Sequence, residues 1–128
     1  MQLPESRRFS KPQVLCVDES ETQLWLRASV LEKNGFSVLN ASTAVRALDL
    51  LRRNPVCLIL SDHMLTESTG AELAVKMKRI KPHVPLVLYS GAPPDTLRNV
   101  DCFIQKDESV ESFVAIIRGL VSRYYKQV

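Results

Sequence analysis

The chain has little glycine, no run of apolar residues long enough to cross a membrane, and no strong excess of charge of either sign. Its 128 residues include 4 glycines and 7 prolines, and 45% of them are apolar. This composition excludes collagen-like and low-complexity chains and is typical of an ordinary globular protein. A chain of this length folds around a single core, so a two-domain enzyme is not expected.

The cysteines match neither a disulfide framework nor a zinc site. All three, Cys16, Cys57 and Cys102, lie in or beside apolar runs, and their odd number and spacing favour reduced, buried thiols. The polar first 12 residues contain no apolar core of a signal peptide, and no membrane span is present. We therefore expect a cytoplasmic protein without membrane contact.

The charge balance also excludes an obvious nucleic-acid binder. There are 17 basic and 14 acidic residues, which leaves a net charge of +3. Nucleic-acid binding usually needs a concentrated basic face. The basic residues near the two ends of the chain are interpreted as solvated termini, so no direct nucleic-acid partner is expected.

Apolar runs rich in β-branched residues alternate with segments of helical periodicity. The five runs, at 14–17, 37–41, 56–60, 84–89 and 102–105, predict five strands. Several are apolar at consecutive positions, which is typical of strands covered on both faces. We interpret residues 1–12 as a flexible lead-in, 13–122 as the folded domain and 123–128 as a C-terminal tail.

Helix signals occupy most of the intervals between these strands. Ser20 with Gln23 forms a capping box before a helix that ends at Asn34-Gly35. The second helix is predicted to begin at Ser42 and to end before Pro55. A third is predicted after Gly70, and a last one, capped by Ser109, is predicted to run into residues 123–126.

The interval between Tyr89 and Cys102 breaks the alternation. It is too short, and too rich in proline, for a helix of average length, which is about 11 residues. We predict at most one or two helical turns there. The complete pattern predicts a single doubly wound α/β domain with three α/β/α layers, a five-stranded parallel sheet of order 2-1-3-4-5, and a fourth helix that is shortened or missing.

Polar residues follow four of the predicted strands. Because the carboxyl ends of parallel strands share one edge of a sheet, these residues should meet there. Clustered carboxylates repel one another unless a cation lies among them. Oxygen ligands without His or Cys favour Mg²⁺, with Mn²⁺ a possible substitute. The residues are Asp18 and Glu19, Asp62, Ser90, and Lys106.

Such a site can carry out phosphoryl transfer, because a metal ion and a lysine offset the phosphoryl charge while a carboxylate attacks phosphorus. Asp62 is the nucleophile candidate because it follows the central strand, and Asp18 and Glu19 would hold the metal. Dinucleotide and P-loop sites are disfavoured, since acidic residues replace a glycine-rich loop. A dehalogenase-type phosphatase is also disfavoured because Asp62 is followed by His63 and Met64.

Four segments include the predicted site residues, and they are VLCVDE at 14–19, LILSDHML at 58–65, VLYSG at 87–91 and FIQK at 103–106. Together they resemble the receiver domain of two-component response regulators. They are similar to the family's first strand with its acid pair, its phosphoacceptor segment, its strand that ends in Ser or Thr, and its strand with an aromatic residue followed by lysine. Gly70 also matches the glycine that opens the family's third helix.

The resemblance implies a flavodoxin-like switch module that is not an enzyme beyond its own phosphorylation and dephosphorylation. A sensor histidine kinase or histidine phosphotransfer protein would phosphorylate Asp62, and a downstream protein would be the target. Mg²⁺ would be held by Asp18, Glu19, Asp62 and the Met64 carbonyl. Ser90 and Lys106 would bind the phosphoryl oxygens, and a movement of Ser90 would be coupled to Phe103 as the switch.

Three departures from the family pattern keep other hypotheses open. Asp107 follows Lys106 where the family usually has proline, Thr66 replaces a second proline, and the connection after Tyr89 is short. The leading hypothesis is a stand-alone receiver that signals by protein contact. The alternatives are a degenerate receiver that binds partners without phosphorylation and, less favoured, a small phosphatase.

Overall fold

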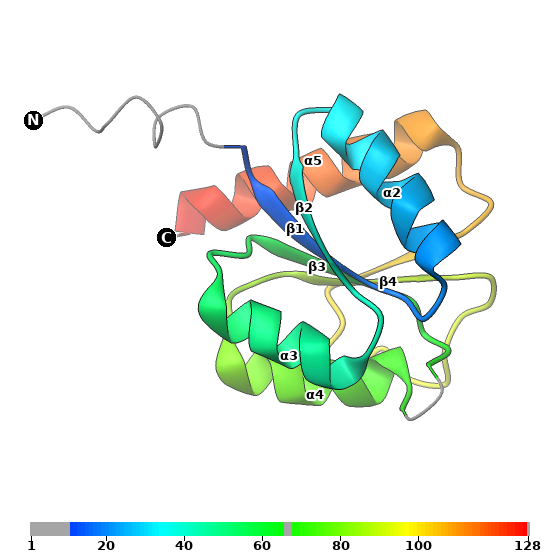
Figure 1. The fold of residues 1–128 in the computed structure, drawn as a ribbon, viewed down its shortest axis with the longest axis vertical. Helices are drawn as coiled ribbons and strands as arrows, with labels where there is room; N and C mark the ends of the chain where they lie inside the picture. The colour runs from blue at the N-terminus through cyan, green and yellow to red at the C-terminus, as the bar shows by residue number, and fades with distance from the viewer. Residues whose placement is uncertain (1–10, 66–67, 128) are drawn as a thin grey trace, which may run out of the picture.

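The computed structural model describes residues 11–65 and 68–127 (Figure 1). Most of the predicted lead-in, residues 1–10, lies outside the described residues, as does Thr66. Within the described part, no helix is long and apolar enough to span a bilayer.

Five strands form one sheet of order β2-β1-β3-β4-β5, and every neighbouring pair is parallel. This confirms the predicted sheet. β3 lies at its centre, and its residues are buried on both faces. The strands are β1 (Gln13–Val17), β2 (Ser37–Ala41), β3 (Leu58–Ser61), β4 (Leu86–Ser90) and β5 (Cys102–Gln105).

Two helices cover each face of the sheet, with α2 and α5 on one side and α3 and α4 on the other (Figure 1). Side-chain oxygens cap the first three helices, because Ser20, Thr43 and Thr69 each accept a hydrogen bond from the backbone N–H three residues later. The helices are α2 (Glu21–Lys33), α3 (Ala44–Arg53), α4 (Gly70–Ile80) and α5 (Val110–Gln127).

The helix ends follow the sequence with one correction. α3 begins at Ala44 with Thr43 as its cap, not at Ser42, because the Thr43 hydroxyl accepts from the Arg46 N–H at 3.1 Å. α5 includes residues 123–126, as predicted, and ends at Gln127. The division of the chain at residue 122 stays an interpretation.

Two strands are shorter at their N-terminal ends than predicted. β3 starts at Leu58 and β4 at Leu86, although the apolar residues before them are also buried. Val56 donates its N–H to the nearby Asn54 carbonyl at 2.9 Å instead of joining the sheet. Pro85 has no N–H to give to a ladder. Burial therefore begins before regular pairing does.

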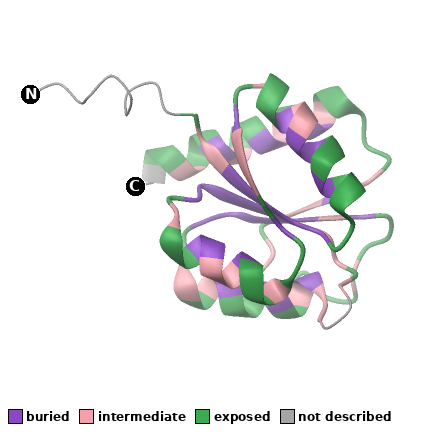
Figure 2. Ribbon diagram, in the orientation of Figure 1, coloured by how far each residue is buried: buried purple, intermediate pink, exposed green. Residues whose placement is uncertain are grey.

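The sheet separates two apolar clusters, and the burial colouring shows its inner strands, β1, β3 and β4, as the buried layer between them (Figure 2). On one side, Leu24 and Leu31 of α2 pack with Phe113 and Ile117 of α5. On the other side, Leu51 of α3 packs with residues of α4 that include Leu73 and Met77. Burial of both sheet faces explains the consecutive apolar residues in the strands.

The connection between β4 and β5, residues 91–101, forms no helix, which agrees with the predicted loss of the fourth helix. Asp101 anchors its far end. The Asp101 carboxylate accepts hydrogen bonds from Lys78 Nζ at 2.6 Å and from the Leu86 N–H at 2.7 Å, and the Asp101 N–H donates to the Leu86 carbonyl at 2.9 Å. These bonds hold the start of β4 to the residue before β5.

All three cysteines are free thiols, as predicted. Cys16 and Cys57 are buried, but Cys102 is only half-buried because β5 is an edge strand. Burial raises the pKa of Cys16 to about 12 and also raises the pKa of Cys57 and Cys102, so these thiols remain protonated at neutral pH.

Candidate functional site at the carboxyl edge of the sheet

Backbone hydrogen bonds bring the first residue after three of the strands to one edge. The Asp18 N–H donates to the carbonyl of Ala41 at the end of β2 at 3.1 Å, and the Asp62 N–H donates to Val17 at the end of β1 at 2.9 Å. The Lys106 N–H likewise donates to Ser90 at the end of β4 at 3.0 Å. Asp18, Asp62 and Lys106 therefore lie at the same edge of the sheet, and each is bonded to the last residue of a neighbouring strand.

Asp62 and Lys106 form the direct contact of the site. Lys106 Nζ lies 3.5 Å from Asp62 Oδ1, and both side chains are partly shielded from solvent. The same Asp62 oxygen accepts the His63 N–H at 2.9 Å. This contact places one carboxylate and one ammonium group together, which are two of the groups that phosphoryl transfer uses.

Asp18 is more deeply buried than Asp62, with 3% of its surface exposed. Its Oδ1 accepts the Ser20 N–H at 2.9 Å at the start of α2. Its Oδ2 accepts a hydrogen bond from Nη2 of Arg27, which is itself 5% exposed. Both Asp18 oxygens therefore already have partners in the chain, and one partner is a buried cation.

The Tyr89 ring lies near both cations of the site. The Arg27 guanidinium carbon lies 5.2 Å from the centre of the Tyr89 ring, and Lys106 Nζ lies 5.9 Å from it. Both distances are within the range of cation–π attraction. The ring also packs against Phe113 of α5, with centroids 5.2 Å apart. Tyr89 thus contacts one cation from the Asp18–Arg27 pair and one from the Asp62–Lys106 pair.

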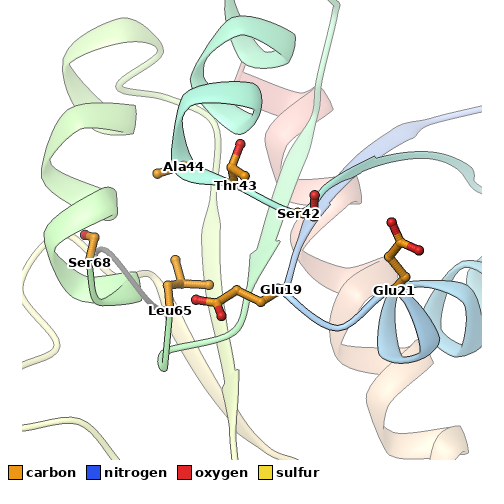
Figure 3. Close-up of a pocket in the computed structure, with 7 residues that line it drawn as sticks. All are labelled: Glu19, Glu21, Ser42, Thr43, Ala44, Leu65 and Ser68. Atoms are coloured by element: carbon orange, nitrogen blue, oxygen red, sulfur yellow. The ribbon is translucent and has the colours of Figure 1, made fainter.

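Glu19 lines a hollow of about 320 Å³ beside this edge. Figure 3 shows its carboxylate extending toward Leu65, in the loop after β3. Ser42 and Thr43, which follow β2, also line this hollow. Glu19 is exposed, in contrast to the neighbouring Asp18. The two predicted metal ligands of the acid pair therefore occupy different environments.

The loop after β3 turns back at Met64, which forms an isolated antiparallel bridge with Thr69. The Met64 side chain is 70% exposed. The Gly70 N–H then donates to the His63 carbonyl at 2.7 Å. A Cβ at Gly70 would lie only 2.6 Å from the Asp62 carbonyl oxygen, so glycine is needed for this close approach.

The two predicted switch residues lie on neighbouring strands. Ser90 is 6% exposed at the end of β4 and pairs with Gln105 in the sheet. Phe103 of β5 is half-buried and packs against the apolar cluster on the α3 and α4 side. Coupling between Ser90 and Phe103 stays a prediction.

The donor chemistry of this edge suits a hard cation, since Asp18, Glu19, Asp62 and the Met64 carbonyl offer only oxygen. The arrangement of these oxygens is less suitable for a metal ion, because Asp18 already accepts a hydrogen bond from Arg27. Among residues 11–65 and 68–127, no group of three or more His, Cys, Asp or Glu side chains is placed to hold a metal ion. Mg²⁺ therefore fits the ligand types, but it would compete with Arg27 for Oδ2 of Asp18.

Sequence reasoning missed Arg27. The spacing of Leu24, Ala28 and Leu31 predicts the buried face of α2, and Arg27 lies on the same face at helical spacing. The sequence did contain a signal for it. Arg27 lies within the apolar stripe of α2 and nine residues after Asp18, the first residue of the acidic pair. Its partner could not be read from periodicity, because Asp18 lies outside the helix.

The fold and its edge define a doubly wound α/β domain with an acid and lysine site at the carboxyl ends of its strands. A family profile described as the response regulator receiver domain matches residues 14–118. The chain therefore belongs to the receiver domains of two-component response regulators, which are signalling modules and not enzymes. This membership does not support the phosphatase hypothesis.

Individual relatives agree with this membership. The two-component response regulator ORR5 of Oryza sativa subsp. japonica is 34% identical over 96 residues, which cover 72% of this chain and 71% of the relative. ORR11 of Oryza sativa subsp. indica is 32% identical over 124 residues, which cover 91% and 80%.

Solved structures confirm the fold. The CheY-like receiver domain protein of Methanospirillum hungatei JF-1 superposes with a TM-score of 0.84 at 24% identity, covering 93% of this chain and all of that one. At this identity the likeness concerns the fold, and the roles of single residues need their own argument.

Proposed function

We propose that this chain is a phosphorylatable receiver that accepts a phosphoryl group on Asp62. The donor would be a sensor histidine kinase or a histidine phosphotransfer protein, and the output would be altered contact with a downstream protein. The observation that carries this proposal is the 3.5 Å contact between Lys106 Nζ and Asp62 Oδ1 at the carboxyl edge of the sheet.

In the proposed transfer, an Asp62 carboxylate oxygen attacks phosphorus and forms an acyl phosphate. The phosphorus–nitrogen bond of the donor phosphohistidine breaks, and its electron pair returns to the imidazole, which takes up a proton. Lys106 offsets the charge on the transferred oxygens. Its backbone bond to the Ser90 carbonyl at 3.0 Å fixes it beside Ser90, whose hydroxyl is the second proposed phosphoryl ligand.

Mg²⁺ is the proposed cofactor, and it would supply positive charge next to the phosphoryl oxygens. Asp18, Glu19, Asp62 and the Met64 carbonyl are the proposed ligands. Support comes from the oxygen-only donor set and from the hollow that Glu19 lines beside the loop after β3 (Figure 3). Movement of Ser90 toward the phosphoryl group would be transmitted to Phe103, its proposed partner on the neighbouring strand.

Incubation with acetyl phosphate and Mg²⁺, followed by intact-protein mass spectrometry, tests the proposal. Wild type should gain a phosphate-mass adduct, and Asp62→Asn should gain none. Asp95→Asn is the matched control, because Asp95 is an exposed carboxylate in the connection after β4, and it should retain the adduct. An adduct of equal yield on Asp62→Asn would refute Asp62 as the acceptor.

A degenerate receiver that binds partners without phosphorylation is the second candidate. The Asp18–Arg27 pair favours it, because a predicted metal ligand is already neutralised inside the chain. Failure of wild type to gain an adduct, both with acetyl phosphate and with its cognate kinase, would decide for this candidate.

A further inference from the structure

Arg27 is the most unusual charged residue in the described part of the chain. It occupies the buried face of α2 among leucines and alanine and is 5% exposed. Its Nη2 donates to Asp18, whereas its Nε and Nη1 are buried without hydrogen-bond partners. Because a buried cation is costly unless it is paired, the pair with Asp18 is what makes this position tolerable.

We propose that Arg27 is a built-in competitor of the divalent cation, so that Mg²⁺ and the Arg27 guanidinium exclude each other from Asp18. This inference rests on the proposed function, because it concerns the metal ion that phosphoryl transfer to Asp62 would use. Arg27 would thus be a positioning residue that sets the metal affinity of the receiver.

Competition follows from the geometry of the Asp18 carboxylate. Oδ1 accepts the Ser20 N–H at 2.9 Å and Oδ2 is held by Arg27. A cation entering at Oδ2 would meet the guanidinium at a distance where two positive charges repel strongly in a buried environment. Mg²⁺ also demands close, near-octahedral oxygen coordination, which leaves little room for a guanidinium at the same oxygen. The ion can therefore use Oδ2 only after Arg27 has withdrawn.

The surroundings of Arg27 allow a second position for the guanidinium. The Tyr89 ring, 5.2 Å from its central carbon, can retain the cation after Asp18 has been released. Release from Asp18 is costly, however, because Arg27 Nε and Nη1 already lack hydrogen-bond partners and Nη2 would lose its bond to Asp18 as well. Metal binding must therefore overcome the loss of the ion pair, which lowers the apparent affinity.

Calorimetric titration with MgCl₂ in the absence of any phosphodonor tests this proposal. Arg27→Met keeps the apolar stem and removes the charge, and it should bind Mg²⁺ about tenfold or more tightly than wild type. Arg53→Met is the matched control, since it removes the same charge from an exposed position at the last residue of α3. It should bind Mg²⁺ within about twofold of wild type.

Asp18→Asn shows whether the competition is direct. If Arg27 acts through Asp18, the gain from Arg27→Met should disappear when Asp18→Asn is also present. A gain of the same size in both backgrounds would overturn direct competition and indicate a general effect of charge. Equal Mg²⁺ affinity of wild type and Arg27→Met, or no binding by either, would overturn the proposal.

Arg27→Met leaves Asp18 buried without its cation, so the variant could unfold without metal. The second measurement therefore uses wild type alone. The Nε–H resonance of Arg27, followed by NMR during the titration, should shift with the same midpoint as the Asp62 amide. An Arg27 resonance that stays unchanged while the Asp62 amide saturates would overturn the proposal.

Failure here is distinguishable from failure of the proposed function. If Mg²⁺ affinity does not depend on Arg27 but wild type still gains the acetyl phosphate adduct on Asp62, only the competition is wrong. If Arg27→Met binds Mg²⁺ more tightly and neither protein gains an adduct, the competition stands and the phosphoacceptor function is wrong.

Discussion

Replacing Gly70 with alanine should destabilise the fold and displace the backbone that carries Asp62. A Cβ at Gly70 would lie 2.6 Å from the Asp62 carbonyl oxygen, 2.7 Å from Leu88 Cδ2 and 3.0 Å from His63 Cα. Two of these three atoms belong to the backbone and cannot be relieved by a change of rotamer. The Asp62 carbonyl would have to withdraw by about 0.8 Å to reach the ordinary contact distance of 3.4 Å.

Overpacking of this kind costs about 1–3 kcal/mol. The lower chain entropy of alanine in the unfolded state returns about 0.4–1 kcal/mol, so we expect a net loss of about 1 kcal/mol and at most about 2.6 kcal/mol. Because misplacement of a reacting group by about 1 Å can slow a reaction about a hundredfold, Gly70→Ala should also slow phosphorylation of Asp62 by at least about tenfold.

Gly119→Ala is the matched control. Gly119 is exposed within α5, and a Cβ there would have nothing within 4 Å. The same substitution should therefore stabilise the protein, by about 1 kcal/mol, through helix propensity. Urea unfolding followed by circular dichroism measures both changes, and the rate of acetyl phosphate labelling measures the second effect. A Gly70→Ala protein as stable and as rapidly labelled as wild type would refute the close approach.

Two other predictions concern parts of the fold away from the phosphoacceptor. Asp101→Ala should cost about 1–3 kcal/mol in urea unfolding, because it leaves the Leu86 N–H without its acceptor and Lys78 without its ion pair; a change below about 0.5 kcal/mol would show that the anchor contributes little. Tyr125 should ionise late, since desolvation and then the nearby Cys57 thiol raise its pKa from 10.0 to about 12. The native state keeps the Tyr125 proton to a higher pH than the unfolded chain does. The contribution of this raised pKa to the free energy of unfolding is therefore complete below pH 10 and is lost as the pH rises toward 12. The loss should be below about 1 kcal/mol for this partly exposed side chain, and Tyr125→Phe should remove the late step from an ultraviolet tyrosinate titration; an unchanged titration curve would contradict this assignment.

The sequence was sufficient for the sheet and for the edge where the polar residues gather. Buried runs reveal strands covered on both faces, and in a parallel sheet the residues after each strand lie along the same edge. Asp18 and Asp62 are therefore predicted to lie at neighbouring strand ends, and their backbone bonds to Ala41 and Val17 confirm this placement. Their chemical roles remain proposals, because position at an edge does not by itself show phosphoryl transfer.

The features that could not be predicted depend on partners distant in sequence. The apolar character of Val56 predicts that it is buried, but it does not show whether the residue pairs in the sheet. Buried residues inside a strand and just before it are equally apolar. The anchor at Asp101 could not be predicted either, because its partners lie on α4 and at the start of β4. Arg27 is the clearest case, because an apolar stripe predicts burial of a helix face but not a buried charge within it.

The charge balance at the edge shows how an additional cation would alter the site. With Lys106 as the only cation among three carboxylates, one divalent ion makes the unphosphorylated site formally neutral. With Arg27 also present, the same ion leaves one positive charge in excess. Phosphorylation of Asp62 adds about one negative charge, since a phosphoryl group carries about two where the carboxylate carried one. Arg27 would therefore move the formally neutral state of the proposed receiver from the metal-bound, unphosphorylated form to the metal-bound, phosphorylated form.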